Sequence, residues 1–334
     1  MTLHQSNKAH VLAYFDALEK AQLSSIDAVL NQYLASNYRF MGVHPFNELN
    51  SAEAVAREVW HPLKRSFGHL QRRQDVFMAG TSEIAGDPWV MSMGHFMGLF
   101  DEDWLGIRAN RKLVMLRYAE FNRVEDGKIT ATGLWLDIIG LMRQVGINPL
   151  PPETGQYFVY PGPRTHDGLL YDSYPEEDGR FTLELLNRMI DDLDLLNVSG
   201  EDHCKPEFLA RTWHEDMAWY GPAGIGATFT IERYQQQHQV PFRAGLTDKV
   251  YRGHVCRFAE GNYACFFGWP NLTHRPLGGF LGLTDGSATE MRVVDVYRRE
   301  GEKLAENWVL IDIPHWLLGQ GLDILERTRQ IENP

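Results

Sequence analysis

Three polar side chains in the second half of the chain have the chemistry to move a proton, and Asp295 is the first of them. It lies in a Val-rich run, where strand alternation puts its carboxylate on one face with Tyr297. A carboxylate on an apolar face is either paired with a cation or raised in pKa, and the raised state suits proton abstraction. The pattern favours the alternative, a salt bridge with Arg292 or Arg298.

His254 and Asn307 are the other two candidates. His254 alternates with apolar residues, and an imidazole titrates near neutral pH, so it could act as a general base. A histidine that is simply satisfied on a sheet is the favoured alternative. Asn307 shares a strand face with Val309, opposite Trp308, and could hydrogen-bond a ligand carbonyl or enolate. We therefore assign His254, Asp295 and Asn307 as candidate catalytic residues.

Aromatic residues gather in the same half of the chain. The candidate ligand-binding residues are Trp219, Tyr220, Trp269, His274 and Trp308. Such residues also form ordinary cores, which is the alternative. The glycine loop 221–226 lacks the spacing of a dinucleotide or P-loop motif, so nucleotide binding is rejected. No His or Cys set has metal-ligand spacing, and we expect neither a metal nor a cofactor.

The composition narrows the class of protein. A length of 334 residues suggests about two domains, and a net charge of −12 argues against nucleic acid or an anionic membrane as partner. No apolar run approaches the ~18 residues of a membrane span, and the N-terminus is typical of an amphipathic helix rather than a signal peptide. Cys204, Cys256 and Cys265 are typical of reduced, buried thiols, so we expect a cytoplasmic protein.

The two halves of the chain repeat each other. Gly42, Pro62 and Asp75 have counterparts 179 positions later, at Gly221, Pro241 and His254. Further along, the separation is 175 positions for five pairs: Arg117 and Arg292, Glu120 and Asp295, Arg123 and Arg298, Lys128 and Lys303, and Asp137 and Asp312. One loop insertion or deletion explains the change, and we infer a tandem duplication.

Each copy has helices first, then a meander of strands, then a short helix, which indicates an α+β fold. The predicted divisions are domain 1 at 1–147, a Pro/Gly-rich connector at 148–180 that packs on something, and domain 2 at 181–334. In the second copy one strand is expected over 250–258. Asp137 and Asp312 each precede an apolar helix, and we interpret them as structural caps, worth ~1 kcal/mol each.

The closing residues of each copy resemble the SnoaL-like polyketide cyclase family of the NTF2-like superfamily. They are Asp126-Gly127-Lys128, Trp135…Asp137 with Gln144-Val-Gly146, and, in the second copy, Trp308…Asp312 with Gly319-Gln320-Gly321. The resemblance implies tandem cone-shaped domains, each a curved antiparallel sheet around helices with an apolar pocket. It also implies sheet-to-sheet pairing, here within one chain, and allows a homo-oligomer.

The resemblance implies a catalytic carboxylate on the last strand with a histidine before it. That carboxylate position falls at Leu134 and Val309, and the histidine position at Thr132 and Asn307. This sequence has neither group there, so the cyclase activity would need another acid or base. Because the first copy is less polar on this face, we expect the working pocket in the second copy.

The sequence leads to two functional hypotheses. The first is proton-transfer chemistry (cyclisation, isomerisation or dehydration) on an apolar carbonyl compound in the pocket of domain 2. The second is a non-catalytic binding or assembly module of the same fold. Polar groups converging inside a dry pocket would favour the enzyme, whereas a pocket plugged by Trp269 and Trp308 would favour the binding module.

Overall fold

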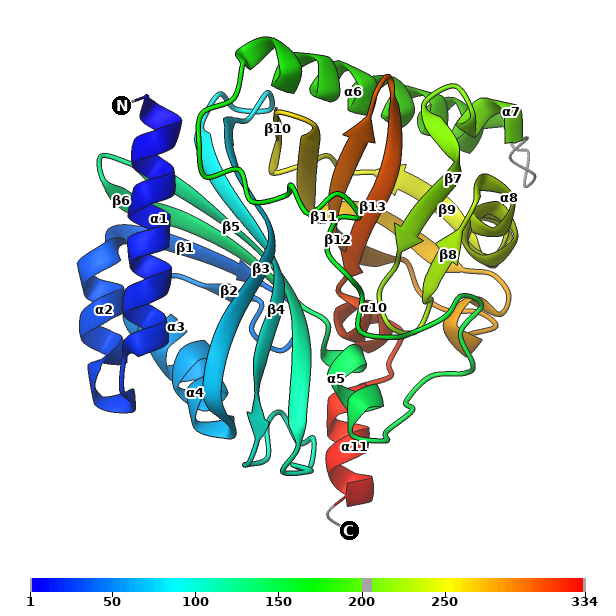
Figure 1. The fold of residues 1–334 in the computed structure, drawn as a ribbon. Helices are drawn as coiled ribbons and strands as arrows, with labels where there is room; N and C mark the ends of the chain where they lie inside the picture. Colours follow the sequence, from blue (N-terminus) through cyan, green and yellow to red (C-terminus); the bar gives the residue numbers. More distant parts are fainter. Residues whose placement is uncertain (1, 200–205, 333–334) are drawn as a thin grey trace.

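The computed structural model describes residues 2–199 and 206–332. They form two α+β domains joined by a connector (Figure 1). Cys204 lies outside the described residues, whereas Cys256 and Cys265 are buried free thiols. Within the described part of the chain, no helix is both long and apolar enough to cross a membrane.

The first domain has its helices before most of its sheet. The helical elements are α1 (Leu3–Lys20), a 3-10 turn (Leu23–Ser25), α2 (Ile26–Tyr33), α3 (Ala52–Val55), a π-helical turn (Ala56–Trp60), α4 (His61–Ser66) and, after the sheet, α5 (Ile138–Gln144). The strands are β1 (Leu34–Gly42), β2 (Glu48–Leu49), β3 (Phe67–Thr81), β4 (Pro88–Phe100), β5 (Leu113–Glu125) and β6 (Lys128–Leu136). Their order is β2-β1-β6-β5-β4-β3, and β1 runs parallel to β6.

The second domain repeats this plan. Its helical elements are α6 (Glu176–Ser199), α7 (Pro206–Leu209), α8 (Ile231–Tyr234), a π-helical turn (Gln235–Gln239), α9 (Val240–Gly245), a 3-10 turn (Phe280–Gly282), α10 (Ile313–Gly319) and α11 (Ile324–Glu332). The strands are β7 (Trp213–Tyr220), β8 (Ala227–Phe229), β9 (Leu246–Tyr251), β10 (Cys256–Glu260), β11 (Tyr263–Pro276), β12 (Thr289–Glu300) and β13 (Lys303–Ile311). Their order is β10-β11-β12-β13-β7-β8, with β9 also on β11 and β7 parallel to β13.

The register of the two sheets matches the repeat found in the sequence. Phe40 pairs with Thr132 between β1 and β6, and Trp219 pairs with Asn307 between β7 and β13. These pairs are related by the separations of 179 and 175 positions. The π-helical turns 56–60 and 235–239 are also 179 positions apart, so even this irregularity is repeated.

One predicted strand is wrong. The sequence predicts a continuous strand over 250–258, but the chain leaves the sheet after Tyr251 and re-enters it at Cys256. Gly253, with φ of 106°, lies in this break, a conformation that glycine adopts without steric cost. His254 therefore lies in a loop, although Asp75, at the matching position, lies inside β3.

The outer faces of the two sheets pack against each other. The ring of Phe267 lies 4.8 Å from that of Phe121 and 5.1 Å from that of Trp135, at the centre of a hydrophobic cluster drawn from both domains. Figure 1 shows the two sheets facing each other, with α1–α4 beyond the first sheet and α8 beyond the second, each on the side away from the interface. The inner face of each sheet is thus the one turned toward its own helices.

Asp137 and Asp312 cap helices and also join the domains. Asp137 Oδ1 accepts a hydrogen bond from Gly140 N at 2.9 Å at the start of α5, and its Oδ2 accepts from Ala223 N of the second domain at 3.1 Å. Asp312 accepts from His315 N at 3.1 Å at the start of α10 and from His44 N of the first domain at 2.9 Å.

Two arginines repeat this symmetry between the domains. Arg117 donates to Gly221 O at 3.3 Å, and Arg292 donates to Gly42 O at 3.4 Å. The donors are 175 positions apart and the acceptors 179, so the interface contacts are reciprocal.

The connector packs on both domains. Leu170 N donates to Phe77 O at 2.9 Å in the first domain, and Gly155 N donates to Ile225 O at 2.8 Å in the second. Tyr160 and Leu170 are buried. Helix α6 begins at Glu176, five residues before the predicted boundary at 181, so the irregular part of the connector is shorter than the sequence indicates.

Candidate active site

The second domain contains a cavity of about 180 Å³ between the inner face of its sheet and its helices. The cavity is lined mainly by apolar and aromatic side chains with a few polar ones: Met189, Leu193, Leu209, Trp213, Trp219, Tyr234, His238, Phe242, Phe266, Asn271, Leu272, Met291, Val293, Asp295, Tyr297, Asn307, Val309 and Ile311. A concave apolar site with few polar groups is typical of small-molecule pockets.

Strand alternation directs Asp295 into this cavity. Its neighbours Val294 and Val296 belong to the hydrophobic cluster shared with the first domain, whereas Val293 and Tyr297 belong to the core of the second domain. Side chains two residues apart share a face, so Asp295 and Tyr297 project inward together. Two apolar layers thus hold β12 in place and fix the direction of the carboxylate.

Asp295 is held by two neutral donors. Its Oδ1 accepts from Tyr297 Oη at 3.0 Å and from Asn307 Nδ2 at 3.2 Å. Among the described residues, none donates to Oδ2 and no basic side chain pairs with the carboxylate. The cations that the sequence offers are engaged elsewhere, since Arg292 pairs with Asp312 at 3.2 Å and Arg298 with Glu300 at 2.8 Å and with Glu306.

Burial raises the pKa of Asp295 to about 7, while the hydrogen bonds from Asn307 and Tyr297 limit the rise. The carboxyl is 8% exposed, and water therefore stabilises its charge poorly. A group with this pKa exchanges protons readily at neutral pH, which is what general acid–base catalysis requires.

Both N–H groups of the Asn307 side-chain amide make hydrogen bonds within the protein. Its Nδ2 donates to Asp295 Oδ1 and to Val296 O, the latter at 3.1 Å. An amide nitrogen has two protons, so no donor remains for a ligand oxyanion. Asn307 therefore orients Asp295, and the predicted role of holding an oxyanion does not fit this geometry.

At the position equivalent to Asp295, the first domain has a carboxylate whose charge is neutralised. Glu120, the counterpart of Asp295, is fully buried and pairs with Arg72 at 2.7 Å. The guanidinium of Arg72 lies 3.6 Å from the ring centroid of Phe15 and 4.7 Å from that of Phe96. A cavity of only about 20 Å³ remains beside it. The first domain thus has a neutralised carboxylate in a filled interior.

His254 does not line the cavity. The centroid of its ring lies 3.9 Å from that of Phe266, which does line the cavity, and the two rings stack. Within the described residues, His254 Nδ1 has no hydrogen-bond partner. Burial lowers the pKa of His254 to about 3, so it stays neutral and is a weak base at neutral pH. His254 lies in the loop between β9 and β10, beside the cavity but outside its lining.

Of the five predicted ligand-binding residues, Trp219 alone lines the cavity. Trp308 and Tyr220 lie on the outer face of the sheet, stacked at 5.5 Å, and Trp308 Nε1 donates to Pro161 O of the connector. Trp269 lies at the domain interface, with Nε1 3.3 Å from Gly42 O. His274 is buried beside Trp316, and burial lowers its pKa to about 4.

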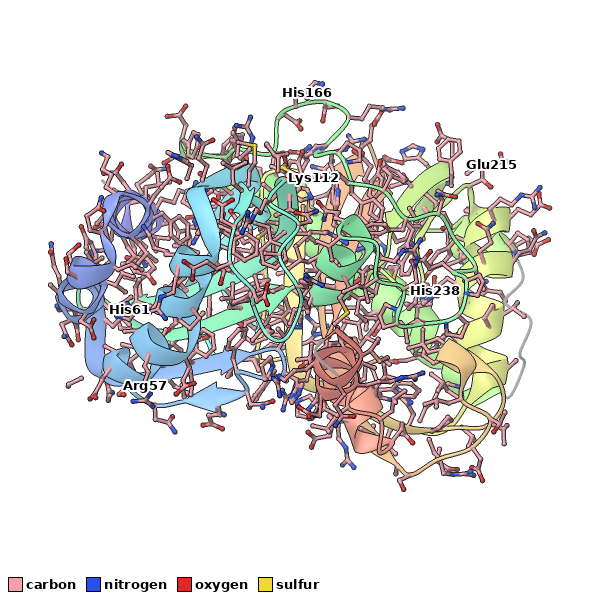
Figure 2. All side chains as sticks on the ribbon, turned by 90° about the horizontal axis from the view of Figure 1, so that it is seen from below. Arg57, His61, Lys112, His166, Glu215 and His238 are labelled. Carbon is pink, nitrogen blue, oxygen red and sulfur yellow. The ribbon has the colours of Figure 1, made fainter. Side chains whose placement is uncertain are left out.

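Three polar residues of the cavity were missed as site candidates. Tyr297 is two residues from Asp295, and alternation alone could have identified it. Asn271 faces inward because β11 shifts register between Gly268 and Leu272, which no local pattern announces. His238 lies on the π-helical turn, stacked at 4.1 Å on Trp219, and Figure 2 places it inside the second domain.

The comparisons with known proteins identify the first domain. Residues 9–145 match the family described as SnoaL-like polyketide cyclase. The first domain is SnoaL-like. The family match covers this domain, and the second domain is related to it by its strand order and register. No curated protein sequence matches the chain.

Several solved structures of SnoaL-like and NTF2-like proteins resemble part of the chain. A protein of Jannaschia sp. CCS1 named as a SnoaL-like polyketide cyclase is 18% identical over 46% of this chain and 97% of its own, with a TM-score of 0.36. One of Xanthomonas campestris pv. campestris, named as a polyketide cyclase, is 20% identical over 43% and 100%, with a TM-score of 0.36. An NTF2-like protein of Burkholderia xenovorans LB400 is 12% identical over 42% and 97%, with a TM-score of 0.34.

The described residues contain no group of three or more His, Cys, Asp or Glu side chains arranged to hold a metal ion.

Proposed function

We propose that the second domain is the working domain and that Asp295 transfers a proton at the carbon next to a ligand carbonyl. The observation that carries this proposal is the unpaired, buried carboxyl of Asp295 in an apolar cavity, set against the Arg72-paired Glu120 of the first domain. Cyclisation, isomerisation and dehydration of carbonyl compounds all begin with such a transfer. The SnoaL-like domain supports small-molecule chemistry in this fold.

Each residue has a defined role in this proposal. The carboxylate of Asp295 takes the proton from carbon through Oδ2 and later returns it. Tyr297 and Asn307 hold Oδ1 and so orient the group. Neither Trp269 nor Trp308 lines the cavity, whereas Asp295, Tyr297 and Asn307 converge in it, and this arrangement supports the enzyme over a plugged binding module.

The test is deuterium exchange at carbon. The protein is incubated with cyclohex-2-enone or cyclohexanone in D₂O, and loss of the proton signal next to the carbonyl is followed by ¹H NMR. Exchange faster than in buffer is expected, with a rate that rises as Asp295 ionises near pH 7. Asp295→Asn should abolish the protein-dependent rate. Asp216→Asn, an exposed carboxylate on the outer face of the same sheet, is the matched control.

A non-catalytic binding module is the competing proposal, because an apolar cavity holds a ligand whether or not it reacts. It predicts that cyclohex-2-enone binds but does not exchange. Equal exchange rates for Asp295→Asn and the Asp216→Asn control would decide for binding alone.

We also infer that the two domains pair within the chain in place of a dimer of single domains. The reciprocal contacts of Asp137 and Asp312 and the shared cluster around Phe267 support this. A monomeric mass by light scattering is expected, and a stable dimer would show that additional pairing between chains exists.

A further inference from the structure

The cavity of the second domain is small for an enzyme pocket. Its volume is about 180 Å³. An engineered protein cavity of about 150 Å³ takes up one benzene molecule, whereas pockets for drug-sized ligands have roughly 300–1,000 Å³. The volume therefore corresponds to one six-membered ring with one or two small substituents.

The walls of the cavity are braced by ring contacts. The ring of Trp219 stacks on that of His238, with the centroids 4.1 Å apart, and its centroid lies 5.6 Å from that of the Tyr234 ring. The ring centroids of Trp213 and Tyr297 are 5.9 Å apart. A ring that already packs against a second ring cannot turn away without losing that contact and opening a void. The size of the cavity is thus set by several rings that support one another.

The charge of the cavity selects against anions. Among the described residues that line it there is no Lys or Arg, and its acidic group is Asp295. A ligand carboxylate or phosphate would be buried beside this carboxylate without a compensating cation, which costs several kcal/mol. A neutral ligand avoids that cost.

Asn271 is the amide that remains free for the ligand. It is 9% exposed and lines the cavity, and its side chain makes no hydrogen bond with any described residue. His238 also lines the cavity and is neutral, because burial lowers its pKa to about 3. The amide of Asn271 is open to the cavity, so a ligand oxygen there can accept a hydrogen bond from Nδ2.

We propose that this cavity selects a neutral carbonyl compound with a single ring, whose oxygen accepts a hydrogen bond from Asn271. This inference rests on the proposed function and narrows its substrate class. In the step it implies, the C–H bond next to the carbonyl breaks and an O–H bond forms on Asp295. The electron pair moves to the carbonyl oxygen as an enolate, which Asn271 Nδ2 stabilises until the proton returns to carbon.

Ligand binding tests the size and charge limits without requiring turnover. The probes are cyclohex-2-enone, its two-ring analogue 1-tetralone, and benzoate, with affinities measured by saturation-transfer NMR and titration at pH 8. Cyclohex-2-enone is expected to bind at least about tenfold more tightly than 1-tetralone or benzoate. Equal affinity for 1-tetralone would overturn the size limit, and equal affinity for benzoate would overturn the charge limit.

Two variants separate the proposal from a loss of folding. Met291→Ala enlarges the cavity and should admit 1-tetralone, a gain that an unfolded protein cannot show. Asn271→Leu should lose about tenfold in affinity for cyclohex-2-enone while keeping its affinity for benzene, which offers no oxygen. Loss of both ligands in a folded Asn271→Leu protein, or of neither, would contradict the role of Asn271.

The outcomes distinguish this inference from the proposed function. Size-limited binding of cyclohex-2-enone without proton exchange would remove the catalytic proposal and leave the ligand class standing. Proton exchange that is as fast with 1-tetralone as with cyclohex-2-enone would remove the single-ring ligand class and leave the catalytic proposal standing.

Discussion

Asp295 and Val309 lie directly opposite each other across β12 and β13. Opposed residues of neighbouring strands project from the same face, and both line the cavity. The SnoaL-like resemblance places its acid–base carboxylate at Val309, where this chain has no ionisable group. Asp295 supplies a carboxylate one strand away on the same wall of the cavity, which is the position that the proposed proton transfer uses.

The first domain has the same pairing, with Glu120 opposite Leu134 across β5 and β6. The difference between the domains is therefore not where the carboxylate lies but what neutralises it. Arg72 pairs with Glu120, whereas in the described part of the chain Asp295 meets only the neutral donors Tyr297 and Asn307.

Asp295→Asn should stabilise the protein at alkaline pH. The pKa of Asp295 is about 7 in the folded state and about 3.9 in an unfolded chain. Between these values the folded state binds a proton that the unfolded state does not, so stability falls as pH rises from about 4 to about 7. Asn carries no such penalty, and the gain at pH 8 should be on the order of 2–4 kcal/mol.

Urea unfolding at pH 4 and pH 8 measures this effect. Only a small difference between wild type and Asp295→Asn is expected at pH 4, where the folded wild type holds the proton and about half of its unfolded chains do. Asp312, whose pKa burial also raises, to about 6, is present in both proteins and cancels in the difference. A variant that loses stability equally at both pH values would show that the pKa of Asp295 is not raised in the folded protein.

Tyr297→Phe should raise the pKa of Asp295 further. The Tyr297 hydroxyl donates to Oδ1 and favours the charged form, so its removal makes ionisation harder. The pH profile of deuterium exchange should shift to higher pH, with the maximal rate preserved once Asp295 is ionised. Asn307→Leu should shift it in the same direction, and an unchanged midpoint in both variants would argue against Asp295 as the group that titrates.

Arg72→Met should destabilise the protein without removing exchange activity. The change leaves Glu120 buried without its cation, which costs roughly 3–5 kcal/mol. Arg72→Met/Glu120→Gln is the matched control and should recover much of the stability, and retained exchange in both variants would place the activity in the second domain.

Asp312→Ala should cost more stability than Asp137→Ala. Both lose a helix cap, worth about 1 kcal/mol, and a hydrogen bond from the other domain. Asp312 also neutralises Arg292, which is buried, and a hydrogen bond to a charged group contributes about 1.5–3 kcal/mol. Thermal unfolding should show the difference, and equal losses would mean that the Arg292 pair contributes nothing net.

The sequence alone determined the α+β fold, the duplication and the two helix-capping positions. The repeat was visible because strand ends, turns and caps are set by local residues, such as Asp137 and Asp312 before their helices. Alternation also put Asp295 on one strand face with Tyr297, and Asn307 on one face with Val309, but only the tertiary structure shows that these faces line the cavity. The same rule gave the wrong position for His254, because Gly253 interrupts the strand on which the rule depends.

Only the tertiary structure decided which charges meet and which interior stays open. Arg72 and Glu120 are far apart in sequence, as are Asn271 and Asp295, and their proximity depends on how strands pair and where β11 shifts its register. The sequence favoured a salt bridge for Asp295 because Arg292 and Arg298 lie close along the chain. Those arginines face the opposite domain and the connector, so no cation of the described residues pairs with the carboxyl, and desolvation gives it the pKa on which the proposed chemistry depends.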